Sequence, residues 1–295
     1  MKSNLENICY NLSMTLKKLF YYLLIIPVGL VLISLGLFWL TVHPQKTRSS
    51  ETPEKYKLDY ENVSLTSFDG TKLAGWYLPA KKPTNKAILM LHGYPMDKGD
   101  LLPTATLFEI NFNILLVDLR GMGQSGGAVA TFGAKEQQDM KYAVDYLESK
   151  GNTSIGIFGY AEGGSIGLLA AAQDARIKAA AEYGAFADLP GLVQNQYQKL
   201  GVLDKPMAGL VTFWERLFFG LLPNPARAAE KIIAPVLVIH NQGDEVVPFA
   251  QAQKLQAALA KNPSAEFYFP AGGSHSEPPL DFEIRTNNFF KTKLP

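Results

Sequence analysis

Residues 154–164, SIGIFGYAEGG, decide the fold. The first five residues of this stretch predict a buried strand, and an apolar helix is expected directly behind it, as far as about Ala172. Gly159 and Gly163 stand two positions before and two positions after Ala161. A strained strand-to-helix turn requires small residues at this spacing, because neighbouring backbone packs against the residue at the tip. The stretch therefore predicts a tight turn that presents Ala161 at the carboxyl edge of a sheet.

Outward from this turn, strand-like and helix-like stretches alternate along the chain. Three apolar runs have the length of fully buried parallel strands: Ala87–Leu91, Asn113–Val117 and Pro235–Ile239. A helix is predicted over Ala134–Ser149, and residues 63–68 and 72–78 flank the hairpin dipeptide Asp69-Gly70. This alternation predicts an α/β fold, with a mostly parallel central sheet flanked by helices and an antiparallel hairpin at its leading edge.

Composition excludes several classes of protein. The 295 residues include 28 Lys and Arg against 27 Asp and Glu, a formal net charge of +1, and 47% are hydrophobic. A chain this apolar is not disordered, and it lacks the basic field that nucleic-acid binding needs. The single cysteine, Cys9, rules out an intrachain disulfide framework. The four histidines show no metal-ligand spacing and phosphate-type glycine motifs are absent, so no metal or organic cofactor is expected.

The N-terminal region contains a candidate membrane anchor. Residues 20–42 are free of charge, and as a helix they would measure about 34 Å, enough to cross a hydrocarbon core of about 30 Å. A cleaved signal peptide is the alternative, but the run is too long and Thr41–Pro44 offers no cleavage site. We therefore expect an N-terminal tail over 1–19, a single transmembrane helix over 20–42, and a polar linker over 43–58 with little structure of its own.

The charges beside the apolar run nearly balance. Lys2, Lys17 and Lys18 precede it, and four cations follow within the counting window: Lys46, Arg48, Lys55 and Lys57. Since the Lys17-Lys18 pair abuts the run directly and long domains translocate largely regardless of charge, we expect the N-terminus inside and the C-terminal domain, residues 59–295, on the extracytoplasmic side.

Polar residues follow three of the predicted strands, where an open α/β sheet binds its ligands. Behind Leu91 comes His92-Gly93-Tyr94-Pro95, in which the Tyr94 N–H can serve as an oxyanion donor. The Glu162 N–H, at the helix terminus behind the turn, is the second candidate donor. Asp244 follows the strand that ends at Ile239, and His275 follows a strand predicted at 266–269. An acid and a histidine in adjacent loops can form a pair in which the acid sets the tautomer of the imidazole.

Taken together, these motifs resemble the α/β-hydrolase superfamily, in particular its serine-hydrolase branch of lipases, esterases and thioesterases. The resemblance covers about residues 62–290 and depends on five motifs in order: His92-Gly93, Asp118–Gly126, Gly159–Gly164, Gly243-Asp244 and His275. It implies hydrolysis of carboxylic esters, thioesters or amides. It also implies that Asp244 is the acid of a catalytic triad, that His275 is the general base, and that the Tyr94 and Glu162 amides form the oxyanion hole.

Ala161 departs from this pattern, because the family has Ser there, or in some branches Cys or Asp. Ser165 and Ser125 are poor substitutes: the first should face away from the site, and the second lies in a structural turn. The Glu162 side chain is expected to point to solvent or to an ion pair. Two explanations of Ala161 remain open, an engineered inactivation and a natural pseudoenzyme. In the second, a non-catalytic protein would use the same pocket for binding or as a scaffold.

An insertion over about 185–226 occupies the position of a cap. Its second half carries apolar residues at helical spacing: Met207, Leu210, Val211, Trp214, Leu217, Phe218 and Leu221. This helix either packs on its own domain or lines an apolar pocket. An apolar cap close to a membrane favours a small-molecule substrate that is lipid-like or acylated.

Overall fold

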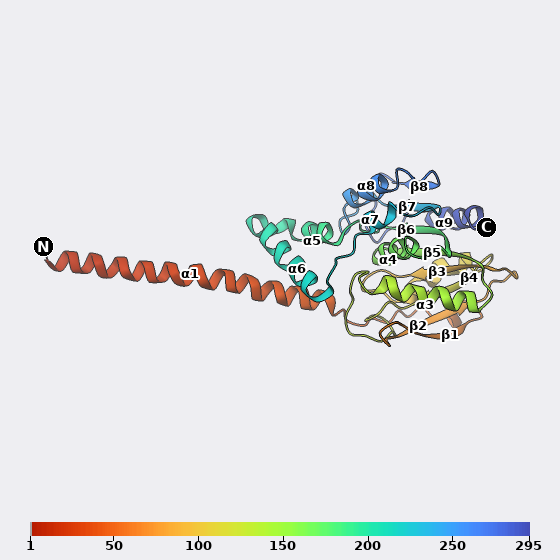
Figure 1. The fold of residues 1–295 in the computed structure, drawn as a ribbon, viewed down its shortest axis with the longest axis horizontal. Helices are drawn as coiled ribbons and strands as arrows, with labels where there is room; N and C mark the ends of the chain where they lie inside the picture. Colours follow the sequence, from red (N-terminus) through yellow and green to blue (C-terminus); the bar gives the residue numbers. More distant parts are fainter. Residues whose placement is uncertain (1) are drawn as a thin grey trace.

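An eight-stranded sheet forms the centre of the C-terminal domain (Figure 1). The computed structural model describes the backbone of residues 2–295 and the side chains from Tyr10 onward. The strands are β1 (Glu61–Thr66), β2 (Lys72–Leu78), β3 (Lys86–Leu91), β4 (Asn113–Val117), β5 (Ser154–Tyr160), β6 (Ile177–Tyr183), β7 (Val236–Ile239) and β8 (Ala265–Tyr268). Their spatial order is β1-β2-β4-β3-β5-β6-β7-β8, and β2 pairs antiparallel with both of its neighbours. The other pairs are parallel, so the predicted α/β fold and leading hairpin are confirmed.

The helices connect and cover these strands. They are α1 (Lys2–Val42), α2 (Leu102–Phe108), α3 (Glu136–Ser149), α4 (Glu162–Ala171), α5 (Leu189–Tyr197), α6 (Asp204–Phe219), α7 (Pro225–Ala229), α8 (Phe249–Ala258) and α9 (Phe282–Lys293). Three short 3-10 helices are η1 (Pro53–Tyr56), η2 (Lys98–Leu101) and η3 (Gln198–Leu203).

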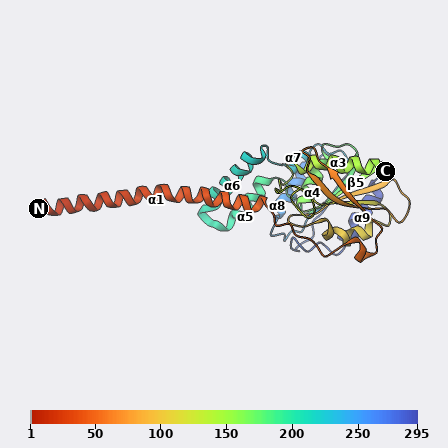
Figure 2. The same cartoon turned by 90° about the horizontal axis from the view of Figure 1, so that it is seen from below.

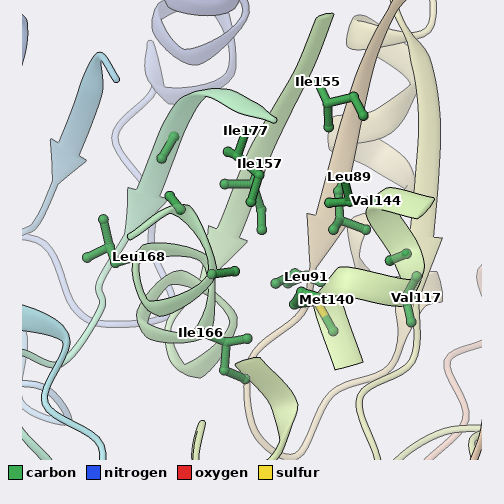
Figure 3. Packing of buried hydrophobic residues seen from close by; sticks show 14 of the residues in the cluster. Leu89, Leu91, Val117, Met140, Val144, Ile155, Ile157, Ile166, Leu168 and Ile177 are labelled. Carbon is green, nitrogen blue, oxygen red and sulfur yellow. The ribbon is translucent and has the colours of Figure 1, made fainter. Parts of the chain in front are cut away.

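Each face of the sheet is sealed by its own apolar cluster. On one face, side chains of β3 and β5 such as Leu89 and Ile157 pack against Met140 and Val144 of α3 and Ile166 of α4 (Figure 3). On the other face, α2 and α9 contribute their aromatic and aliphatic residues to a second cluster. Burial on both faces explains why β3, β4 and β5 are almost continuously apolar, the pattern from which parallel strands were predicted.

β6 is the one strand that the sequence pattern does not predict. Its residues, IKAAAEY, include three consecutive alanines, which favour helices when local propensity alone decides. In the fold this stretch pairs with β5 on one side and β7 on the other. Small side chains are useful there because α4 packs closely on it; a Cβ placed on Gly164 would lie 2.9 Å from the Cβ of Glu182. Tertiary packing therefore overrides the local preference.

The loop Asp118–Gly126, after β4, is held in place by buried ion pairs between side chains. Lys98 Nζ lies 2.7 Å from Asp118 Oδ2, and both side chains are inaccessible to solvent. Arg120 bridges Asp139 of α3 and Asp69 of the leading hairpin, at 2.6 Å and 2.8 Å. These contacts join the hairpin, α3 and the loops behind β3 and β4, so the motif serves as a structural junction.

α1 is a single helix that extends well beyond the domain (Figures 1 and 2). Tyr10–Val42 is long and apolar enough to cross a membrane, and an 18-residue window within it has a mean hydropathy of 2.6. Residues 2–19, expected as a tail, continue the same helix.

The segment 43–58, expected to be a linker with little structure, is ordered against the domain. Thr47 Oγ1 donates to the carbonyl of Pro95 at 2.6 Å, the Ser49 N–H donates to Asp97, and η1 follows. The polar composition of this segment reflects hydrogen bonds to a neighbouring loop, and these cannot be inferred from the segment alone.

Replacement of Arg120 tests the buried junction. Arg120→Ala should lower the free energy of unfolding by about 3 kcal/mol or more, because it leaves the Asp139 carboxylate buried without its cation. Denaturant unfolding of the detergent-solubilised protein measures the loss. Arg285→Ala is the matched control, since its pair with Asp281 is exposed and is expected to contribute at most about 1 kcal/mol. Equal losses in the two variants would contradict the structural role of the junction.

Candidate active site

The turn between β5 and α4 has the predicted strained geometry. Ala161 adopts φ 50° and ψ −115°, a combination that residues other than glycine rarely adopt. A Cβ on Gly159 would overlap the backbone of Gly163, and a Cβ on Gly163 would overlap the carbonyl oxygen of Leu91. Both glycines are therefore required by the packing of β5, α4 and β3 against one another. The conformation of Ala161 follows from this packing and places it at the carboxyl edge of the sheet.

Asp244 and His275 form the expected pair. Asp244 Oδ2 lies 2.6 Å from His275 Nδ1, and both side chains are largely buried. The other carboxylate oxygen accepts from the backbone N–H groups of Val246 and Val247 at 2.9 Å and 2.7 Å. These amides orient the carboxylate, and the carboxylate in turn sets the tautomer that carries its proton on Nδ1. His275 Nε2 is left available for proton transfer.

His275 lies close to the turn at Ala161. The Ala161 N–H donates to the carbonyl of Tyr183 at 2.7 Å, and Gly184 follows directly. A Cβ on Gly184 would come within 3.1 Å of His275 Cε1, so the imidazole occupies the space beside this backbone. The ring of Tyr160, one residue before Ala161, meets the His275 ring edge-on with centroids 6.0 Å apart. The structure therefore gathers Asp244, His275 and Ala161 at one edge of the sheet.

Two backbone amides are free at the same place. A Cβ on Gly93 would lie 3.1 Å from the Cβ of Ala161, so the loop behind β3 runs directly past the turn. Among the described residues, neither the Tyr94 N–H nor the Glu162 N–H donates a hydrogen bond. Glu162 is the first residue of α4, where helix geometry leaves the amide without an internal acceptor. Backbone amides without an internal acceptor are the kind of donor that stabilises an oxyanion, so these two are candidates for that role.

The other two histidines of the domain have structural roles. His92 is fully buried and accepts from the N–H of Leu119 at 3.0 Å, which ties the end of β3 to the loop behind β4. Burial lowers its pKa. His240 lies beneath Asp244, with its Nε2 2.7 Å from the carbonyl of Val247, and burial lowers its pKa as well.

Neither candidate serine can act as a nucleophile. Ser165 Oγ exchanges hydrogen bonds with the backbone carbonyl and N–H of Phe186, and Ser125 Oγ donates to the Asp118 carbonyl while accepting from the Ala74 N–H. Both side chains are fully committed to backbone groups and almost wholly buried. The prediction that they are structural is confirmed.

The expectation for the Glu162 side chain is wrong. It points neither to solvent nor to an ion pair: it is 4% exposed, and neither carboxylate oxygen has a hydrogen-bond partner among the described residues. Burial, with the Glu136 carboxylate as a smaller cause, raises its pKa well above the usual range. Its position on the first turn of α4 faces it into the domain, a direction that helical phase alone does not reveal.

Three side chains that the sequence analysis missed hold the His275 loop in place. The hydroxyls of Tyr160 and Tyr183 both donate to the carbonyl of His275, at 2.9 Å and 3.1 Å. Asn241 Nδ2 donates to the carbonyl of Ser274 at 2.9 Å. No local motif marks these residues, because their partners lie between 33 and 115 positions away along the chain.

Comparison with known proteins identifies the family. The model of the dienelactone hydrolase family matches residues 125–276, just over half of the chain. The chain belongs to this family. The match begins in the loop after β4 and ends one residue beyond His275, so it includes the strained turn and the Asp244–His275 pair.

Individual proteins support the same grouping. The chain is 27% identical to protein YfhR of Escherichia coli over 72% of each chain, and 26% identical to protein YqkD of Bacillus subtilis over 85% of this chain and 87% of that one. The fold is similar to that of an esterase from Pyrococcus furiosus, with a TM-score of 0.74 and 22% identity over 87% of this chain and 99% of that one. Membership in the α/β-hydrolase superfamily, a hydrolase family acting on small molecules, is thus established.

A second buried carboxyl lies under the turn and makes stability depend on pH. Glu182 of β6 accepts from the Ala185 N–H at 2.8 Å with one oxygen, while the other has no partner within the part of the chain that the structure describes. Burial, opposed by that hydrogen bond, raises its pKa to about 8 from an ordinary value of 4.5. Between these values the folded protein binds a proton that the unfolded chain has released, so stability falls as pH rises.

Replacement of Glu182 by a side chain that does not titrate tests this pH dependence of stability. Glu182→Gln should raise the thermal midpoint at pH 9 relative to the parent protein, and the difference should shrink towards pH 5, where the Glu182 carboxyl is protonated in the native state. Thermal unfolding at a series of pH values provides the comparison. Exposed Glu230→Gln controls for the loss of one acidic side chain. A Glu182→Gln effect that is the same at both ends of the pH range would contradict the assignment.

Proposed function

We propose that this chain is a membrane-anchored hydrolase of carboxylic esters, thioesters or amides, built around a nucleophile–His–Asp triad whose nucleophile position is occupied by Ala161. The observation that carries the proposal is the 2.6 Å contact between Asp244 and His275 beside the strained turn. In this assignment Asp244 is the acid, His275 the general base, and the Tyr94 and Glu162 amides the oxyanion hole. No cofactor takes part.

Each group has a defined task when residue 161 carries a hydroxyl. His275 Nε2 accepts the proton of the nucleophile as it attacks the carbonyl carbon, and Asp244 stabilises the resulting imidazolium. The two amides bind the oxyanion of the tetrahedral intermediate. His275 then returns the proton to the leaving group, and water hydrolyses the acyl-enzyme by the same steps. With alanine at position 161 no acyl-enzyme can form, so the chain as it stands is inactive by this route.

A non-catalytic role is the second candidate. It is favoured by Ala161 itself, since the strained backbone, the free amides and the Asp–His pair all persist around a methyl group. A pseudoenzyme would use this site to bind an acylated ligand without cleaving it, or would act as a scaffold. The codon for residue 161 in the natural gene separates an engineered replacement from a natural one.

Membrane attachment completes the proposal. Residues 20–42 would span the bilayer once, with the hydrolase domain on the extracytoplasmic side as the Lys17-Lys18 pair indicates. The cap over residues 185–226 is rich in apolar side chains, which favours a lipid-like or acylated substrate.

Restoration of the hydroxyl tests the site. Ala161→Ser should gain labelling by a serine-directed fluorophosphonate and measurable hydrolysis of a short-chain p-nitrophenyl ester, whereas the parent chain shows neither. Loss of the nucleophile costs on the order of a million-fold in turnover in a well-studied serine protease. Ala161→Ser combined with His275→Gln is the control and should remain inactive. A folded Ala161→Ser variant that is neither labelled nor active would favour the binding role.

Membrane attachment is tested separately. The full chain should sediment with membranes and resist extraction by alkaline carbonate, because residues 20–42 would have to leave the hydrocarbon to be released. Immunoblotting of pellet and supernatant measures this. Recovery of a shortened, soluble species that begins after residue 43 would instead indicate a cleaved signal peptide.

A further inference from the structure

The end of α1 is packed against the cap. The ring of Phe38 lies 5.2 Å from that of Phe218 and 5.8 Å from that of Phe219, measured between centroids. Trp214 Nε1 donates to Ser34 Oγ at 3.0 Å, so a polar contact fixes the register of the two helices. Phe38 and Ser34 are both almost fully buried by this contact. α1 is therefore joined to α6 over its last turns and does not simply end at the domain.

The position of Ser34 and Phe38 along α1 determines how deep their contact with the cap lies in a membrane. A hydrocarbon core of about 30 Å needs about 20 helical residues. Residues 20–42 supply 23, and Lys17 and Lys18 stop the span from moving towards the N-terminus, since charged side chains in hydrocarbon are costly. Ser34 and Phe38 consequently lie within the length that the bilayer requires. The part of α6 that packs on these two residues therefore lies at the level of the membrane.

The cap and its flanks expose several large apolar side chains. We call this surface the cap patch; it consists of exposed residues from η3 and α6 and their flanks: Leu200, Val202, Leu203, Phe213, Leu217, Phe218 and Leu221. Val202 and Leu221 are 92% and 91% exposed, which is costly for aliphatic side chains in water. Exposed apolar side chains concentrated on one segment in this way indicate an interaction surface.

The cap projects from the domain on the same side as α1. In two perpendicular views α5 and α6 project from the domain on the side from which α1 leaves it, back towards the N-terminus of α1 (Figures 1 and 2). The exposed cations of this region, Lys199, Lys205 and Arg216, have long side chains that can reach lipid headgroups while their stems lie along apolar surface.

We propose that the cap, α5–η3–α6, is inserted into the membrane leaflet next to the hydrolase domain, with the cap patch in contact with lipid. The inference rests on the membrane anchoring of the proposed function and adds a second membrane contact to it. The partner is the bilayer that α1 crosses, because Phe218 belongs both to the cap patch and to the α1–α6 contact. Like other interfacial helices, α6 combines one apolar face with basic residues.

Cap insertion brings the leaflet next to the candidate site. One apolar cluster joins Phe38 and Val42 of α1 to Phe132, Phe186 and Val247 of the domain. The Tyr94 hydroxyl donates to the Thr41 carbonyl at 2.8 Å, which connects the oxyanion loop directly to the end of α1. An acylated amphiphile in the leaflet would thus reach the site from the side, with its chain along the cap.

Site-directed fluorescence tests the position of the cap. In a Cys9→Ser background, Val202→Cys and Leu217→Cys are labelled with bimane in the full chain, reconstituted in phosphatidylcholine and phosphatidylglycerol vesicles. Ile233→Cys and Leu280→Cys are matched controls, since both are exposed apolar residues of the domain outside the cap. Lipids with a nitroxide near the headgroup should quench the two cap positions and not the controls. A membrane-impermeant maleimide should react with the unlabelled cap cysteines at least about tenfold more slowly than with the controls.

The outcomes separate this inference from the proposed function. Flotation of the chain with vesicles reports on α1, so failure to float rejects the anchor itself. If the chain floats but positions 202 and 217 react as fast as 233 and remain unquenched, the anchor stands and cap insertion is rejected. Slow reaction without quenching would mean that a protein or a second copy of this chain covers the patch, which also rejects cap insertion.

Discussion

The close packing of backbone at Gly159 and Gly163 is the constraint on which the rest of the site depends. Without side chains at these positions, β5 can turn sharply into α4 while α4 lies directly on the end of β3. This packing forces a positive φ on Ala161, and such strain is tolerated because the surrounding structure determines it. The free Glu162 amide and the position of the tip relative to His275 follow from the same turn.

Three buried carboxyls lie near the turn or in the cap. Glu162 and Glu182 lie on either side of the turn, buried and incompletely hydrogen-bonded, and Glu215 of α6 is buried within the cap. Burial raises the pKa of Glu182 and Glu215 to about 8. A protein whose buried acids remain protonated near neutrality sacrifices stability at alkaline pH, and sites of this kind often coincide with functional pockets.

The candidate anchor α1 and the candidate active site form one connected structure. The last turns of α1 pack on α6, the Thr41 carbonyl receives the Tyr94 hydroxyl, and the segment that follows runs along the loop behind β3. The C-terminal end of α1 thus packs as one unit with the cap. A substrate that partitions into lipid would be concentrated beside such a site, which connects the apolar character of the cap with the proposed substrate class.

The sequence by itself determined the features that depend on local spacing. The sequence predicts the fold from the glycine spacing about Ala161 and from the apolar runs of β3, β4 and β5. It predicts that Asp244 and His275 lie near Ala161 from their order along the chain. Each of these predictions needs only neighbouring residues and the rule that parallel strands end at one edge of a sheet. The tertiary structure alone decided which further segment is a strand, which side chains are buried and which distant residues meet. β6 is a strand despite its alanines because β5 and β7 pair with it, and Glu162 is buried because α4 turns that face inward. Tyr160, Tyr183 and Trp214 find their partners 92 to 180 residues away, and no local pattern encodes contacts over such distances.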